Sequence, residues 1–217
     1  MRSSFVRGVL DWGTLNMRDF PWRNTDDPFL ILIAEVLLQR TKADQVLPVY
    51  LLFIKKYRSI SDLSKASEEE IFSLIKPLGL VKRVKGIKQL AQQIVDEYGA
   101  NIPEKKTQLL KIHWIGNYIA NAILCYAYGI STPTYDVNFA RLINRFFLLG
   151  LKKPIDKDTN GYDFASSLMP YAGDKFREFN LSIIDFASLV CKSHKPMCES
   201  CTINSVCKTY VKKQKVG

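Results

Sequence analysis

Four of the five cysteines are gathered near the C-terminus in the pattern C-x6-C-x2-C-x5-C, at Cys191, Cys198, Cys201 and Cys207. Four thiolates from one short loop can enclose either a tetrahedral zinc ion or an iron–sulfur cluster. Zinc ribbons usually contain two C-x2-4-C pairs, whereas only Cys198 and Cys201 form such a pair here. The wide, asymmetric spacing therefore favours an iron–sulfur cluster, with structural zinc as the alternative.

Three basic side chains, Lys192, His194 and Lys195, lie between the first two of these cysteines. A bound cluster could brace this cationic loop against phosphate groups. The charge of the whole chain fits a polyanionic partner, because 31 Lys and Arg oppose 21 Asp and Glu and the sequence pI is about 9.3. Nucleic acid is the most common partner of this kind, and a solvated basic surface is the alternative.

The remaining composition is that of a folded globular protein. The chain has 217 residues, of which 47% are hydrophobic and 24% charged, and this excludes a disordered or fibrous protein. Arg7 and Asp11 interrupt the N-terminal segment, so we expect no signal sequence. The longest apolar stretch, Phe29 to Leu38, contains Glu35 and is about half the length of a membrane span. We therefore expect a soluble, cytoplasmic protein whose cysteines form no disulfides.

Helical periodicity predominates along the chain and strand signals are scarce, which predicts an all-α fold. Ser67 and Glu70 form a capping box at the start of one helix, and Gly99 and Gly129 follow the ends of two others. The basic tail from Tyr210 onward is expected to fray. The predicted helices cover residues 5–17, 28–40, 42–57, 67–76, 83–98, 104–111, 117–128, 136–147, 160–169 and 177–191.

A helix end, a tight turn and an apolar helix follow one another between Leu109 and Gly129. Gly116, just before the second helix, permits close approach of the backbone, and the first amides of a helix have no partner within it. Such amides bind phosphate without reading base sequence. We therefore expect Ile115, Gly116 and Asn117 to bind a nucleic-acid backbone.

Asp136 opens an amphipathic helix eighteen residues after Tyr118, which lies at the exit of the hairpin. With the hairpin, this spacing and the four-cysteine loop, the chain resembles the helix–hairpin–helix DNA glycosylase superfamily. That superfamily includes endonuclease III, the MutY adenine glycosylases and the thymine/uracil–guanine mismatch glycosylases. The resemblance extends from about Phe20 to Tyr210, and it implies that the cysteine loop binds a 4Fe–4S cluster.

The resemblance also implies two helical domains that flank a DNA-binding cleft. The first would be a six-helix barrel containing the helix–hairpin–helix, over residues 28–127. The second would combine residues 1–27 with 128–217 and contain the cluster loop. The stretch from Phe20 to Arg23 matches the family's domain junction, where packing is its expected role.

Two carboxyl groups carry the chemistry that the resemblance implies. Asp136 matches an invariant acidic residue, which would stabilise positive charge on the sugar as the base departs. The N–H groups and dipole of a helix start should keep it ionised.

Glu35 interrupts an apolar run, where burial should raise its pKa and make it a proton donor to the base. MutY and mismatch glycosylases have a matching Glu and endonuclease III does not. A plain N-cap and a salt bridge are the structural alternatives for Asp136 and Glu35.

Tyr118 occupies the position where bifunctional relatives have a Schiff-base lysine, MutY a serine and thymine–guanine mismatch enzymes a tyrosine. A phenol forms no imine, so we expect hydrolysis without strand cleavage. Only ten residues follow Cys207, whereas MutY enzymes add a C-terminal domain. We therefore expect a monomeric, monofunctional glycosylase that removes thymine or uracil mispaired with guanine from double-stranded DNA. Adenine removal and non-catalytic mismatch binding are the alternatives.

Four further residues have weaker assignments. Gln39 and Arg40 end a helix where relatives insert a wedge into the stack vacated by the flipped base. Asn138 could orient a sugar, a phosphate or water near Asp136. A solvated surface position is the alternative for these three residues. Asp185 is expected to be a structural cap or an ion-pair partner.

The hairpin departs from the family pattern. Relatives usually have Leu-Pro-Gly-Val-Gly, and this chain has Ile-His-Trp-Ile-Gly at residues 112–116. Trp114 thus replaces a glycine that commonly adopts a backbone conformation costly for large side chains. His113 is expected to be a surface turn residue. We expect a shifted hairpin, a weaker phosphate grip or an added aromatic contact.

Overall fold

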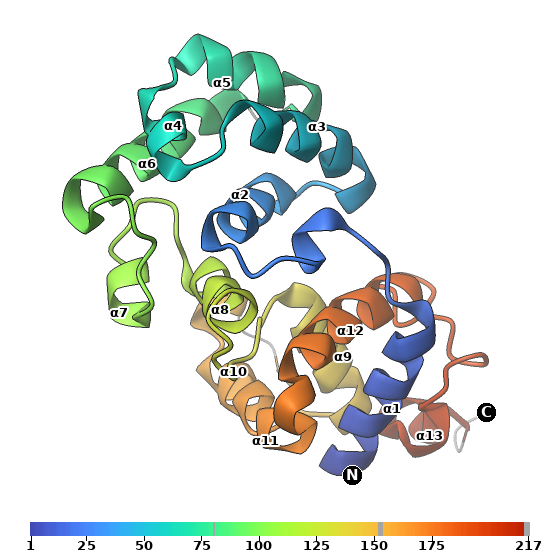
Figure 1. Cartoon of the computed structure of the whole chain (residues 1–217). Coiled ribbons are helices and arrows are strands. Elements are labelled where there is room, and N and C mark those ends of the chain that lie inside the picture. The colour runs from blue at the N-terminus through green and yellow to red at the C-terminus, as the bar shows by residue number, and fades with distance from the viewer. Residues whose placement is uncertain (80, 152–153, 215–217) are drawn as a thin grey trace. The chain divides into compact units, whose positions relative to one another are not determined.

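A computed structural model describes residues 1–79, 81–151 and 154–214, and every regular element in these residues is a helix (Figure 1). The prediction of an all-α fold is therefore confirmed. The chain divides into two compact units. One, called here the central unit, is Phe20–Ile130, and the other, the terminal unit, combines Met1–Asp19 with Ser131–Gly217. The central unit encloses the range 28–127 expected for the barrel.

Helix α2 (Pro28–Leu38) is buried along most of its length, with eight of its eleven residues inaccessible to solvent. A helix that is apolar on almost every side must be covered all round, and α3 and α8 pack against it. Asp27 caps its start by accepting from the N–H groups of Phe29 and Leu30. The other helices of the central unit are α3 (Ala43–Lys56), α4 (Ile60–Lys65), α5 (Glu68–Ile75), α6 (Val84–Tyr98), α7 (Lys106–Leu109) and α8 (Asn117–Tyr126).

The core of the terminal unit is aromatic. Phe5 packs with its ring centroid 4.7 Å from that of Phe146 and 6.3 Å from that of Phe179. Helix α1 approaches α12 closely at Gly13, where a Cβ atom would lie 1.9 Å from the Ser182 hydroxyl oxygen. The helices of this unit are α1 (Arg2–Asn16), α9 (Val137–Phe147), α10 (Thr159–Ser166), α11 (Met169–Ala172), α12 (Phe176–Leu189) and α13 (Lys208–Gln214).

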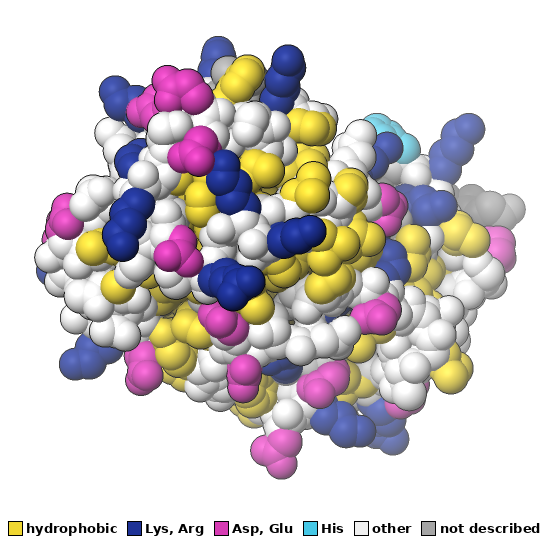
Figure 2. Space-filling view, turned by 45° about the horizontal axis from the view of Figure 1, so that its top comes forward, with side chains coloured by type: hydrophobic (Ala, Val, Ile, Leu, Met, Phe, Trp, Pro, Cys, Tyr) yellow, Lys and Arg dark blue, Asp and Glu magenta, His cyan; other side chains and the backbone are white. Residues whose placement is uncertain are grey.

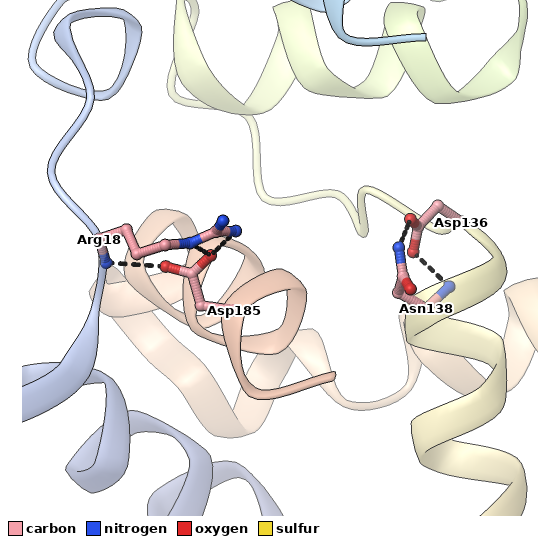
Figure 3. A network of polar contacts seen from close by, with 4 residues as sticks. All are labelled: Arg18, Asp136, Asn138 and Asp185. Atoms are coloured by element: carbon pink, nitrogen blue, oxygen red, sulfur yellow. Dashed lines mark hydrogen bonds and ion pairs between the residues drawn. The ribbon is translucent and has the colours of Figure 1, made fainter. Parts of the chain in front are cut away.

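A half-buried ion pair joins the end of the N-terminal segment to α12. Asp185 is fully buried, and its Oδ1 accepts from Arg18 Nη2 at 2.6 Å and Nε at 2.9 Å (Figure 3). Its Oδ2 accepts from the Arg18 backbone N–H at 2.8 Å. The interpretation of Asp185 as an ion-pair partner is confirmed. This pair fixes geometry, since loss of Arg18 would leave the buried charge of Asp185 without this partner.

Two sequence-based expectations about the ends of helices are wrong. Residues 210–214 of the basic tail are helical in α13 rather than frayed, and the start of this helix is anchored, whereas residues 215–217 lie outside the described residues. The Thr209 hydroxyl donates to the Arg145 carbonyl, and the Tyr210 hydroxyl donates to Glu199 at 2.7 Å. Helix α2 ends at Leu38 rather than at residue 40, because Arg40 has a φ of 56°, which no right-handed helix accommodates.

One face of the molecule shows how its charged side chains are distributed. Figure 2 shows Lys and Arg side chains spread over the face in view, among Asp and Glu, rather than gathered in one patch. Across the described residues, no helix combines the length and apolar character needed to cross a membrane.

Candidate functional site

Asp136 is the N-cap residue of α9, and the first turn of that helix holds its carboxylate (Figure 3). Oδ1 accepts from the backbone N–H groups of Asn138 at 2.9 Å and Phe139 at 2.8 Å. Oδ2 accepts from the side-chain amide of Asn138 at 2.7 Å. The helix forms here because Phe139, Leu142 and Ile143 bury one face and because Asp is a favoured cap. Three donors therefore fix the orientation of the carboxylate.

Two opposing effects act on the charge of Asp136. Burial is the larger effect and raises the pKa of its carboxyl. Hydrogen bonds from Phe139 and Asn138, and the positive charge of Arg141, lower that pKa. The sequence-based expectation considered only effects of the second kind, so burial is an addition from the structure. The carboxylate is half-buried, so solvent screens its effect on a nearby positive charge less than at an exposed site.

Arg141 holds Asn138 in the orientation that Asp136 needs. Its Nη2 donates to Asn138 Oδ1 at 3.1 Å and to the carbonyl of Ala187 at 2.8 Å. Its Nε donates to the carbonyl of Cys191 at 3.1 Å. Because Arg141 engages the amide oxygen of Asn138, the amide nitrogen faces Asp136. Asn138 is thus a positioning residue here, and its predicted contact with a sugar, phosphate or water stays a prediction.

The segment that leads into Asp136 is fastened by Asn180 of α12, which is fully buried. Asn180 Oδ1 accepts from the backbone N–H of Thr134 at 2.9 Å and from its hydroxyl at 3.2 Å. Asn180 Nδ2 donates to the carbonyls of Thr132 and Phe176, each at 3.0 Å. The sequence analysis missed Asn180, although a polar residue within the buried run from Phe179 to Ile183 was a visible signal.

Tyr135 anchors the same segment from its other side. Its hydroxyl donates to Asp158 Oδ2 at 2.6 Å, and Oδ1 of this buried aspartate accepts from Gly161 N–H at the start of α10. Burial and the hydrogen bond to Asp158 raise the pKa of the phenol well above its usual range, so it remains a donor. These residues also escaped the sequence analysis, because their pairing joins positions 23 residues apart.

Glu35 lies on α2 in the central unit and is buried, with 6% of its surface exposed, as its apolar run predicts. Its role as an acid stays a prediction. The turn that follows α2 is held by Arg83, which donates to the carbonyls of Val36 at 3.1 Å and Gln39 at 2.5 Å. Arg40 is exposed with a positive φ, and Gln39 is partly exposed. Both are accessible, as their proposed contact with DNA requires.

The residues at the start of α8 share the central unit with Glu35. Gly116 is the N-cap, with an extended backbone, and both it and Asn117 are exposed. Tyr118 is partly buried in the first turn. Ile115 is 4% exposed, so its side chain belongs to the core and only its backbone is suited to a phosphate contact. Asp136, Asn138 and the cysteines form a second group in the terminal unit.

All four C-terminal cysteines line one pocket of about 150 Å³ within the terminal unit. Burial raises the pKa of Cys201 to about 11, and the neighbouring thiols contribute in the same direction. Four thiolates around one hollow therefore need a positive centre to balance them, and this donor set fits an iron–sulfur cluster. Among the residues that the structure describes, no three His, Cys, Asp or Glu side chains are grouped so that they could hold a single metal ion.

Arg145 joins the two ends of the cysteine loop. Its guanidinium donates to the carbonyls of Lys192 at 2.6 Å and Ser193 at 2.8 Å, and it lies 3.6 Å from the Cys191 sulfur. Its own carbonyl accepts from the Thr209 hydroxyl. Lys192 and Lys195 are exposed, as a role in phosphate binding requires.

Comparison with known proteins agrees with this arrangement. A family model described as HhH-GPD superfamily base excision DNA repair protein matches residues 33–160. The thymine/uracil-DNA glycosylase of Methanothermobacter thermautotrophicus is 36% identical over 212 residues, which cover 97% of this chain and 95% of that protein. The thymine-DNA glycosylase of Aeropyrum pernix is 36% identical over 209 residues, which cover 94% and 93%. The solved structure of a thermostable thymine-DNA glycosylase matches with a TM-score of 0.91 at 36% identity, and the match covers 97% of each chain.

We expect Asn180→Ala to lower the free energy of unfolding by about 2–4 kcal/mol, because it leaves the buried backbone groups of Thr132 and Thr134 without their partner. Urea unfolding followed by circular dichroism measures the change. Asn160→Ala, at an exposed position on α10, is the matched control and should change stability by less than about 0.5 kcal/mol. Equal effects of the two substitutions would contradict the fastening role of Asn180.

Proposed function

The chain belongs to the HhH-GPD superfamily of base excision DNA repair proteins, and from this premise we propose that it is a monofunctional DNA glycosylase. Its proposed substrate is a thymine or uracil mispaired with guanine in double-stranded DNA. The observation that carries the proposal is Asp136, a carboxylate held by three donors where the family places its acidic residue. The 36% identity to thymine/uracil-DNA glycosylases over nearly the whole chain supports the choice of base.

The reaction cleaves the bond between the sugar C1′ and the base nitrogen, and water supplies the hydroxyl group that replaces the base. Positive charge develops on the sugar, and Asp136 stabilises it through its field. Negative charge develops on the departing base, and Glu35 donates a proton to it. Burial of Glu35 suits this role, because loss of solvent favours the protonated form of a carboxyl. The attacking water leaves its hydroxyl group on C1′ and releases its proton to solvent, from which Glu35 regains the proton it gave to the base, so atoms and charge balance.

The base must leave the duplex before it can react. A mismatched pair costs less to open, which contributes to selectivity. Gln39 and Arg40 are accessible at the end of α2, and we assign them to the gap that the flipped base leaves. The backbone amides of residues 115–117 and the exposed Lys192 and Lys195 would bind phosphates without reading sequence.

The four cysteines are proposed to hold a 4Fe–4S cluster. The shared pocket, the burial of Cys201 and the anchoring of both loop ends by Arg145 support this assignment. When bound, the cluster supplies a rigid scaffold for the loop that presents Lys192 and Lys195. Cleavage of the glycosidic bond itself needs only the carboxyl groups and water.

We expect the protein to release thymine or uracil from T·G and U·G duplexes, and to leave T·A duplexes intact. Labelled duplexes, including A·G and adenine opposite oxidised guanine, are incubated with excess enzyme and then treated with alkali. Asp136→Asn should slow single-turnover excision about a thousandfold, because the sugar cation loses its stabilising charge.

Asp163→Asn, at an exposed position on α10, is the matched control and should keep the wild-type rate. Preferential release of adenine would favour the MutY-like alternative. Binding to mismatched duplexes without release of any base would favour the non-catalytic alternative.

Because residue 118 is a tyrosine, we expect borohydride to trap no covalent complex between the wild-type protein and DNA. A phenol forms no imine with the opened sugar. The measurement is gel electrophoresis of a T·G duplex incubated with borohydride, and the control is Tyr118→Lys. That variant introduces the amine that bifunctional relatives use, and a trapped band with it shows that the assay works. Efficient trapping of the wild type would contradict hydrolysis as the sole reaction.

Metal analysis of protein purified without oxygen should find about four iron and four sulfide per chain. Cys198→Ser should lose most of this iron, because it removes one thiolate from the pocket. Cys125→Ala is the control, since Cys125 lies in α8 of the central unit and the C-terminal loop belongs to the terminal unit. One zinc per chain with no sulfide would instead support the structural-zinc alternative.

A further inference from the structure

Trp114 has the backbone conformation that the family's glycine would supply. Its φ is 70°, in the left-handed region that is an outlier for a bulky side chain. The hairpin therefore keeps a left-handed residue at position 114, and its φ has not changed to suit the larger side chain. Something else must therefore hold a tryptophan in this unfavourable conformation.

Gly86, in the first turns of α6, provides the space for the indole of Trp114. A Cβ atom at residue 86 would lie 2.3 Å from Cε2 and 2.6 Å from Nε1 of the indole, so the ring rests directly on the helix backbone. A helix with an internal glycine is less stable than the same helix with alanine. The φ of Gly86 is not positive, so the backbone conformation does not require a glycine there. Contact with Trp114 is therefore the physical reason for a glycine at this position.

Gln93, two helical turns further along α6, bonds the same hairpin turn. Its Oε1 accepts from the backbone N–H of His113 at 2.8 Å, and its Nε2 donates to the carbonyl of Lys111 at 3.1 Å. Residues 86 and 93 are seven positions apart, so they lie on the same side of the helix. One face of α6 thus contacts the hairpin at two points. The indole of Trp114 packs on Gly86, and the side-chain amide of Gln93 bonds the backbone of Lys111 and His113, an arrangement called here the Gln93 clamp.

We propose that Trp114 and Gly86 are a matched pair which, with the Gln93 clamp, fixes the hairpin and thereby positions the phosphate-binding amides of residues 115–117. The pair replaces the flexible glycine of the family pattern with a rigid anchor. Only the part of this inference that concerns DNA binding rests on the proposed function. Trp114 acts as a positioning residue through the backbone that follows it, and it needs no contact with DNA.

A stability cycle tests the pair without DNA. Gly86→Ala should lower Tm in the wild type, because the new methyl group collides with the indole. The same substitution should raise Tm in a Trp114→Gly background, because alanine favours a helix once the ring is gone. This reversal of sign is the expected result, measured by thermal unfolding of four proteins. A change of the same sign in both backgrounds would overturn the pair.

Two of these four proteins suffice if Gly86→Ala alone does not fold. The comparison of Trp114→Gly with the double variant still requires a higher Tm for the double variant. An equal or lower Tm would overturn the proposal.

The positioning role is tested by affinity for an undamaged duplex, measured by fluorescence anisotropy. Trp114→Gly should raise Kd about fivefold, because only a fraction of molecules then hold the competent hairpin. The single-turnover excision rate at saturating enzyme should stay within about twofold of wild type, because that rate reports chemistry rather than binding. An unchanged Kd, or a saturated rate that falls as far as affinity does, would overturn the positioning role.

Gln93→Ala should raise Kd in the same direction, and the matched control is Gln92→Ala. Gln92 is the same residue type on the same helix, is exposed and donates to Asp96 one turn further along α6. Equal effects of these two variants would contradict the clamp. A wild-type protein that binds DNA but releases no base would refute the proposed function. The stability cycle would still test the contact between Trp114 and Gly86, because it needs no DNA.

Discussion

The half-buried carboxylate of Asp136, at the start of α9, is the constraint on which the terminal unit depends. Removing a charge from water costs several kcal/mol unless donors replace the lost solvent. For Asp136 the donors are the backbone N–H groups of Asn138 and Phe139 and the side-chain amide of Asn138. Burial still raises its pKa overall. The charge is thus held at some energetic cost, in an orientation that only the folded helix provides.

The elements around α9 can be understood as supports for that carboxylate. Arg141 orients Asn138 and also bonds the carbonyl of Cys191, so α9 and the cysteine loop share one guanidinium. Asn180 fixes the segment before the helix, and Tyr135 fixes it through Asp158. These supports come from four separate parts of the chain. A substitution in any of them can therefore alter the orientation of Asp136 without contact with a reacting atom.

Local signals in the sequence predicted most of the helices and the principal site residues. The capping box at Ser67, the cap at Asp136 and the apolar run that buries Glu35 each depend on residues a few positions apart. Periodicity and spacing are sufficient for such features. Helix α4, with six residues, is too short to give a periodic pattern, and it was therefore missed.

Long-range pairing explains the other omissions. The tail helix α13 is held through Arg145, and the turn after α2 is held through Arg83, 44 residues away from Gln39. Neither partner can be identified without coordinates, because any backbone carbonyl could accept from Thr209 and any arginine could donate to Gln39. Asp185 was recognised as a buried acid, yet its partner Arg18 is 167 residues distant. The sequence therefore indicates which groups need partners but not which partners they find.

Trp114 and Gly86 extend this reasoning to the hairpin. Each residue alone violates a local preference, since a tryptophan occupies a left-handed turn and a glycine lies inside a helix. Together they are compatible, because the missing Cβ atom of one makes room for the ring of the other. The glycine in the helix thus has a packing reason in the ring of Trp114, as the proposed pair requires. Because the contact lies directly before the amides that start α8, its consequence is expected in the grip on phosphate rather than in the chemistry at the sugar.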